Sequence, residues 1–150
     1  MSGKIYLYLL VLAIVAVHVS CIALGESAES VGRSGYFLYH AGWLHLAANV
    51  MCLLAIARSA FSIRFRDVVS ALAIAAVAPL SAGTTLGASG ICYALLGIMS
   101  WQSCNMPKYH ALITTFVALG LIMPSHVNVP LHAFCYIQGV LFGYIYICRK

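Results

Sequence analysis

The sequence predicts an all-α, polytopic membrane protein with six transmembrane helices, folded as one domain over residues 1–150. Hydrophobic residues make up 63% of the chain and charged residues 7%, whereas a soluble domain has roughly 45–50% and about 25%. Each span needs about 20 residues, so a chain of 150 residues holds six spans joined by short connections. This composition excludes a water-soluble globular domain and leaves no room for a second domain.

Apolar stretches define the expected spans. The first stretch follows Lys4 and is longer than the apolar region of a signal peptide, which is about 7–15 residues and is the competing interpretation. Connectors containing glycine, proline or basic residues separate the later stretches. The third and fifth stretches are short for a full crossing, so we expect their ends to be buried in protein. The expected spans are residues 5–24, 41–60, 68–81, 88–103, 109–123 and 131–148.

The eight basic residues predict the orientation of the chain. They do not form one run, so the net charge of +5 does not indicate a nucleic-acid site. With six crossings, seven of them fall on the side that holds both termini, and basic residues concentrate on the cytoplasmic side of a membrane. Both termini are therefore expected to be cytoplasmic. The seven are Lys4, Arg58, Arg64, Arg66, Lys108, Arg149 and Lys150, and the other side holds Arg33, Glu26 and Glu29.

The six cysteines and six histidines do not indicate a metal site. No C-x-x-C pair occurs, and most of the cysteines fall inside apolar stretches, where cysteine serves as a small buried residue. The histidines are scattered over both sides of the membrane without ligand spacing. We therefore expect no metal, no cofactor and no disulfide framework. The same scatter argues against a small transporter or metal-handling protein.

Polar side chains inside the spans are functional candidates, because the bilayer makes unpaired ones costly. His45 and Asn49 lie one turn apart on one face of the second span, although a polar contact between helices would explain them too. Ser89 stands where a loop meets the fourth span, within Gly87–Gly90. A serine there is commonly an N-cap, but free backbone N–H groups at that position also suit a developing oxyanion.

Small residues predict how the fourth and sixth spans pack. Such stripes let two helices approach closely, and they commonly serve packing alone. Here they would bring His132, at the start of the sixth span, within reach of Ser89. In the six-span topology both residues lie in the outer part of the bilayer, level with the pair on the second span. The stripes are Gly90, Ala94 and Gly97 on the fourth span, and Tyr136, Gly139 and Gly143 on the sixth.

Together these residues resemble the motifs of the rhomboid family of intramembrane serine proteases. They match H-x-x-x-x-H-x-x-x-N from His40 through His45 to Asn49, and G-x-S-G at Gly87–Gly90. They also include a sixth-span histidine followed by packing glycines. The resemblance covers residues 36–148 and, by position, the first span. It implies a rhomboid-like bundle in a bacterial plasma membrane, acting as a serine endopeptidase on transmembrane segments of other proteins.

The resemblance also implies roles for individual residues. Ser89 would be the nucleophile and His132 its general base and then acid. His45, Asn49 and the backbone N–H of Ser89 would stabilise the oxyanion, and Tyr93 would stack against His132. The acidic residues all fall outside the expected spans. We therefore expect a dyad whose histidine is oriented by hydrogen bonding and stacking, unlike the three-residue site of soluble serine proteases.

The sequence departs from the family pattern in three places. Cys135 stands where a glycine is common, the loop at 25–39 lacks a Trp-Arg pair, and the loop at 124–130 is short. His126 in that last loop rivals His132 as the base, but no helical packing stripe follows it. The alternative function is an inactive rhomboid-like protein that binds transmembrane segments. Such relatives usually lack the serine or the histidine, and this chain has both.

Overall fold

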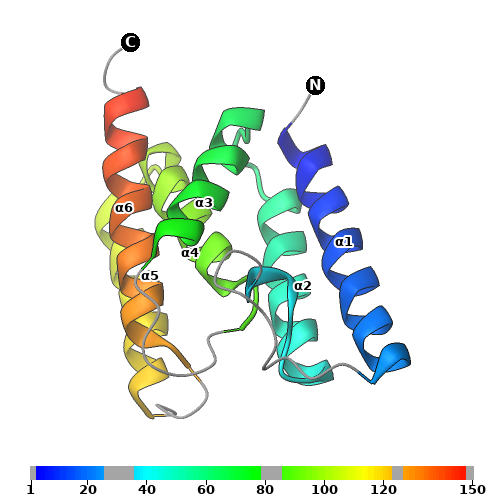
Figure 1. The fold of residues 1–150 in the computed structure, drawn as a ribbon. Helices are drawn as coiled ribbons and strands as arrows, with labels where there is room; N and C mark the ends of the chain where they lie inside the picture. Colours follow the sequence, from blue (N-terminus) through cyan, green and yellow to red (C-terminus); the bar gives the residue numbers. More distant parts are fainter. Residues whose placement is uncertain (1–2, 26–35, 79–85, 123–126, 148–150) are drawn as a thin grey trace.

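A computed structural model describes residues 3–25, 36–78, 86–122 and 127–147 of the chain. The described residues form helices and no strands, which confirms the all-α class (Figure 1). The helices are α1 (Gly3–Leu24), η2 (Tyr36–Leu38), α2 (Trp43–Arg58), α3 (Phe65–Val77), α4 (Ser89–Met99), η3 (Ser100–Gln102), α5 (Met106–Leu119), η4 (Gly120–Ile122) and α6 (Val129–Ile147).

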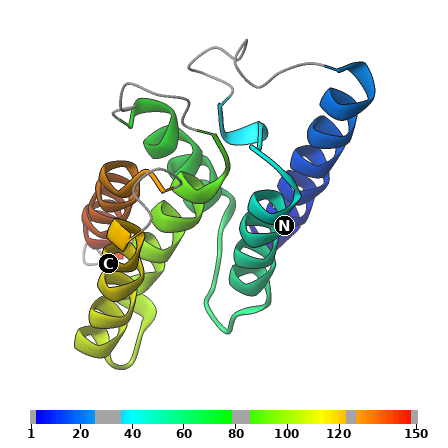
Figure 2. The ribbon, with the colours of Figure 1, turned by 90° about the horizontal axis from the view of Figure 1, so that it is seen from below.

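Helix α4 lies at the centre of the bundle. It packs against α6 most extensively and also contacts α3 and α2, while α1 packs on α2 and α3. Figures 1 and 2 show α1 and α2 side by side on one flank and α5 with α6 on the other. The start of α1 and the end of α6 lie at the same end of the bundle. Most of α4 is buried, so this short helix forms part of the protein core.

Glycines bring α4 and α6 into backbone contact. A Cβ atom on Gly97 would overlap the carbonyl oxygen of Tyr136, and one on Gly139 would overlap the carbonyl oxygen of Ala94. A Cβ on Gly143 would lie 2.7 Å from the carbonyl oxygen of Ile98. Because these distances leave no space for a side chain, the two helices can pack this closely only with glycine at these positions.

Gly90 has different neighbours from the other three glycines. A Cβ atom there would lie 3.2 Å from the hydroxyl oxygen of Tyr36 and 3.3 Å from the sulfur of Cys135. The start of α4 therefore packs on η2 as well as on α6. Cys135 is completely buried in this contact.

Two helices begin earlier than predicted because the sequence analysis missed their capping residues. Helix α3 begins at Phe65, not at residue 68, because the Asp67 carboxylate accepts a hydrogen bond from the Arg64 backbone N–H at 2.8 Å. Helix α5 begins at Met106, not at residue 109, because the side chain of Asn105 accepts from the Lys108 N–H at 3.1 Å. Asp67 is thus a buried residue of a helix and not part of a connector.

The ends of the other predicted spans shift by smaller amounts. Helix α6 begins at Val129, because Asn128 accepts the N–H of Leu131 through its side chain at 3.0 Å. The α-helical part of α4 ends at Met99 and continues as the 3-10 helix η3. Several predicted features lie outside the described residues, namely the span ends at 79–81, 123 and 148, together with Glu26, Glu29, Arg33, His126, Arg149 and Lys150.

The bundle has an apolar exterior. Leu44, Met51 and Val77 are each 70% or more exposed, and many other large apolar side chains of the described residues are also exposed. The segments Gly3–Leu24 and Val129–Tyr146 are long and apolar enough to cross a membrane. The helical segments Trp43–Arg58 and Met106–Ile122 are apolar but shorter.

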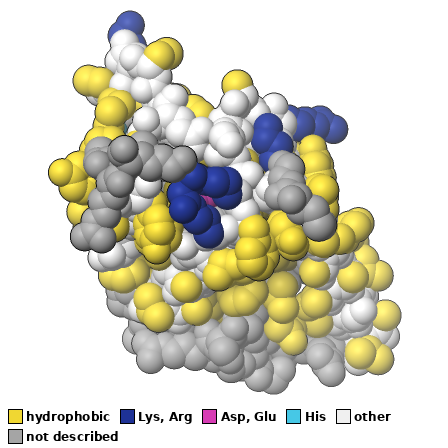
Figure 3. All heavy atoms as spheres, turned by 90° about the horizontal axis from the view of Figure 1, so that it is seen from above, with side chains coloured by type: hydrophobic (Ala, Val, Ile, Leu, Met, Phe, Trp, Pro, Cys, Tyr) yellow, Lys and Arg dark blue, Asp and Glu magenta, His cyan; other side chains and the backbone are white. Residues whose placement is uncertain are grey.

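Basic side chains gather at the end of the bundle where the chain begins and ends (Figure 3). Arg64 and Arg66 flank the buried carboxylate of Asp67 there, with N···O distances of 3.6 and 3.7 Å. Lys4 donates to the carbonyl oxygen of Ser59 at 2.7 Å. These three bases are therefore held by contacts at one end of the bundle.

Candidate active site

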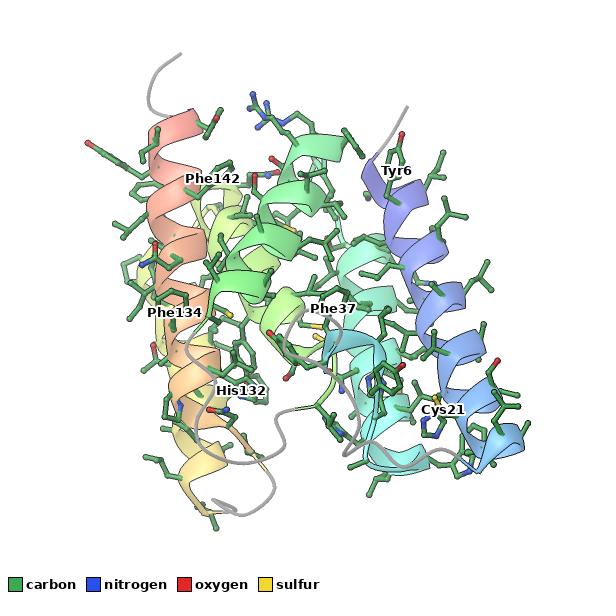
Figure 4. The ribbon with its side chains drawn as sticks, viewed as in Figure 1. Tyr6, Cys21, Phe37, His132, Phe134 and Phe142 are labelled. Atoms are coloured by element: carbon green, nitrogen blue, oxygen red, sulfur yellow. The ribbon has the colours of Figure 1, made fainter. Side chains whose placement is uncertain are left out.

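The first turns of α4 and α6 bring Ser89 and His132 together. The Nε2 atom of His132 lies 2.8 Å from Oγ of Ser89, although the two residues are 43 positions apart in sequence. Figure 4 shows His132 directed from α6 into the bundle. Ser89 is the first residue of α4 and does not cap it, because Ala88 occupies the N-cap position. The Ser89 hydroxyl therefore contacts the imidazole of His132 and does not cap the helix.

The imidazole of His132 is held between the serine and an aromatic ring. The ring of Tyr93 stacks on it with a centroid distance of 4.4 Å and an interplanar angle of 24°. The His132 backbone N–H donates to the carbonyl oxygen of Asn128 at 3.1 Å, which fixes the first turn of α6. Nδ1 of His132 has no hydrogen-bond partner among the described residues. We expected stacking and hydrogen bonding to orient this ring. Among the described residues, Tyr93 provides the stacking and Ser89 the hydrogen bond.

No carboxylate of the described residues lies at this pair. Asp67 is the only acidic residue among those that the structure describes, and it is paired with Arg64 and Arg66 at the start of α3. A serine and a histidine without a third, acidic member make a dyad, in contrast to the triad of soluble serine proteases.

Two polar side chains of α2, His45 and Asn49, lie against the turn before Ser89. Gly87 has φ +99°, a conformation that strains any residue with a side chain. A Cβ atom on Gly87 would lie 2.8 Å from Nε2 of His45 and 3.0 Å from Nδ2 of Asn49. Asn49 uses Nδ2 to donate to the His45 carbonyl oxygen at 3.0 Å. An amide group carries two hydrogens, so a second donor remains at the turn.

Backbone donors complete the arrangement. The first N–H groups of a helix have no acceptor within it, and at the start of α4 the N–H of Cys92 is the first to bond back, to Ala88 at 3.1 Å. The N–H groups of Ser89 and the next residues therefore surround a half-buried hydroxyl. A hydroxyl, a base and several converging donors are the parts that acyl transfer needs.

Tyr36 positions this turn, and the sequence analysis missed it. Its carbonyl oxygen accepts the Gly87 N–H at 3.0 Å, and its hydroxyl donates to the Ala75 carbonyl oxygen at 2.8 Å. Burial raises the pKa of Tyr36 well above its usual range, so the hydroxyl remains a donor. Tyr36 lies in a segment expected to be a loop, and no periodic pattern marks it.

His40 lies apart from the Ser89–His132 pair. Its ring is 5.3 Å from that of His45 and 6.2 Å from that of His18 on α1. Burial, and then the neighbouring His45, lower the pKa of His40 to about 4. His18 and His40 line a cavity of about 340 Å³ together with Cys21, which Figure 4 labels near the end of α1. Within the described ranges, no three metal-ligating side chains come together.

No family model, curated protein or solved structure matches this chain.

Proposed function

We propose that this chain is an intramembrane serine endopeptidase, similar to the rhomboid proteases, that cleaves transmembrane segments of other proteins. The observation that carries the proposal is the contact of 2.8 Å between Nε2 of His132 and Oγ of Ser89. A serine hydroxyl is a weak nucleophile until a base within hydrogen-bond reach can take its proton. The stacked ring of Tyr93 supports the proposal, because it holds that base in place.

The reaction follows the chemistry of acyl transfer. His132 accepts the proton of Ser89 while Oγ attacks the scissile carbonyl carbon, and the carbonyl oxygen becomes an oxyanion. The Ser89 N–H, His45 and Asn49 supply the donors that stabilise it. His132 then donates the proton to the leaving amine. Water, activated by the same imidazole, releases the acyl group from Ser89 and restores the hydroxyl.

A multi-pass topology fits the outside of the bundle. Its exposed apolar side chains would otherwise face water, and such a surface marks contact with a membrane or a partner. Helix α4 has 11 residues and is mostly buried. It is therefore surrounded by other helices and does not need the length of a helix that contacts lipid. In this proposal α1, α2, α3, α5 and α6 have sides that face the lipid, and all six helices cross the membrane region.

The charges support an orientation with both termini in the cytoplasm, in the plasma membrane of a bacterium. The basic side chains gather where the chain begins and ends, and such residues are retained on the cytoplasmic side. His132 lies in the opposite half of the bundle (Figure 4). Cleavage would therefore occur near the outer end of a substrate helix, where water can reach Ser89. The partners are transmembrane substrates and the lipid bilayer, with no cofactor, metal or nucleic acid.

The test is cleavage of a panel of transmembrane substrates by the full chain in vesicles. Ser89→Ala and His132→Ala should each abolish cleavage. Ser103→Ala is the matched control, because that serine lies after η3 at the other end of α4. A fluorophosphonate should label the wild type and Ser103→Ala but not Ser89→Ala. Cleavage that persists in Ser89→Ala would overturn the proposal, and substrate binding without labelling or cleavage would favour an inactive binding protein.

A further inference from the structure

Two cysteines meet one turn beyond the residues of the candidate site. Cys52 on α2 follows Asn49 by three positions, and Cys92 on α4 follows Ser89 by three positions. Their side chains are neighbours across the contact between α2 and α4. Cys92 is 2% exposed, whereas Cys52 is only partly buried. The sequence showed no pairing motif, because these residues are 40 positions apart and on different helices.

We propose that Cys52 and Cys92 form a reversible disulfide that links α2 to α4 beneath the candidate site. Both sulfurs are free thiols in the structure and are already neighbours. A disulfide would bring the two sulfurs to about 2.05 Å from each other. The pair is therefore a modification site, in addition to the packing role that single buried cysteines have.

The difference in exposure sets the order of the reaction. The oxidant is a small disulfide that can enter the bilayer. Cys52, the more exposed of the two, loses its proton and attacks one sulfur of this disulfide, forming a mixed disulfide and releasing one thiolate. Cys92 then loses its proton and attacks the Cys52 sulfur, which releases the second thiolate. The two protons end on the two released thiolates, so two protein thiols are oxidised and one small disulfide is reduced.

The thiol pair is linked to His132 through one side chain. Tyr93 directly follows Cys92 on α4, and its ring stacks on His132. Oxidation removes both thiol protons beside Tyr93 and ties together the helices that carry Asn49 and Ser89. The effect on cleavage, unlike the disulfide itself, rests on the proposed function: the oxidised chain should cleave substrate more slowly.

The experiment uses the full chain in vesicles, with the other four cysteines replaced by alanine and 4,4′-dithiodipyridine as the oxidant. The exchange should release two molecules of thiopyridone per chain and lower the intact mass by two hydrogens, and a reductant should reverse both changes. Cys92→Ala in the same background is the matched control, and should stop at a mixed disulfide on Cys52 after one release. If the four alanines prevent folding, peptide mapping of the oxidised wild type locates the bond instead.

Two results would overturn the disulfide. One is a mixed disulfide that persists on Cys52 while Cys92 is present, and the other is the absence of any exchange at Cys52. Mass and stoichiometry report the bond without any assay of cleavage. A chain that forms the bond but cleaves nothing in its reduced form would count against the proposed function alone. Undiminished cleavage after oxidation would count only against the link through Tyr93.

Discussion

The ring of Tyr93 lies almost parallel to the imidazole of His132, with their centroids 4.4 Å apart. Tyr93 is one turn beyond Ser89, so a single helix carries both the hydroxyl and the ring that holds the histidine. Nδ1 of His132 has no hydrogen-bond partner in the described part of the chain. The plane of the imidazole therefore depends on this stacking contact more than it would in a site with a third, acidic residue.

Two substitutions of Tyr93 should distinguish the role of its ring from the role of its hydroxyl. Tyr93→Phe keeps the stacked ring, so kcat/KM for a model transmembrane substrate should stay near the wild-type value. Tyr93→Ala removes a stacking contact worth about 0.5–1.5 kcal/mol, which corresponds to a ~2- to 12-fold loss of kcat/KM. Equal losses in both variants would show that the hydroxyl, and not the ring, is the important part.

Asn49 provides a test of the oxyanion donors. Asn49→Ala removes the donor beside Gly87, and loss of one such donor typically lowers kcat about 10²–10³-fold. Fluorophosphonate labelling should continue, because Ser89 and His132 are untouched. Asn105→Ala is the matched control, since that asparagine caps α5 and its loss costs about 1 kcal/mol of stability. An unchanged kcat in Asn49→Ala would exclude the residue from the reaction.

The glycine contact between α4 and α6 predicts a linked loss of stability and activity. In Gly139→Ala the new Cβ overlaps the backbone of Ala94, and overpacking of this kind costs about 1–3 kcal/mol. The thermal unfolding midpoint should fall, and cleavage should fall with it, because the same contact aligns Ser89 with His132. Gly42→Ala is the control, since a Cβ there meets nothing within 4 Å. Equal effects of the two substitutions would contradict this explanation.

His40 predicts that acid destabilises the protein. Its pKa is held at about 4 in the folded chain, against about 6.5 when exposed. The unfolded chain therefore binds the proton first as the pH falls. The stabilisation is fully present above about pH 6.5 and is lost towards pH 4, by at most about 3 kcal/mol. The unfolding midpoint of detergent-solubilised protein should decrease over this window.

The matched pair for this measurement is His40→Gln and His110→Gln. The first should flatten the dependence of the unfolding midpoint on pH, because it removes the buried titrating ring. The second removes a ring that contacts the Tyr136 hydroxyl on the other flank of the bundle, and should keep the slope. If His40→Gln keeps the full slope, the titrating group lies elsewhere.

The approach of Ser89 to His132 was predictable because stripes of small residues on both helices favour their close packing. Gly139 and Gly143 recur on the face of His132, and that face must meet a helix without large side chains. The early starts of α3 and α5 could also have been predicted. Asp67 and Asn105 are capping residues by type and position. The helix starts were predicted from apolar stretches, which do not include these polar residues.

Tyr36 and the Cys52–Cys92 contact could not be predicted in this way. Tyr36 bonds to Gly87 and Ala75 from a short 3-10 helix, which has too few residues to show a period. The two cysteines share no spacing rule, since each lies on a different helix and only the packing of α2 on α4 places them together. Contacts of this type depend on the relative rotation of helices, which one sequence does not specify.

The separation of Ser89 and His132 along the chain has a consequence for biosynthesis. The hydroxyl is made 43 residues before the imidazole, and the two meet only when α6 docks against α4. Under the proposed function, a nascent chain that has not yet inserted its last helix would hold a serine without its base. The proposed activity would then begin only once α6 has inserted, so the incomplete chain could not cleave neighbouring helices during synthesis.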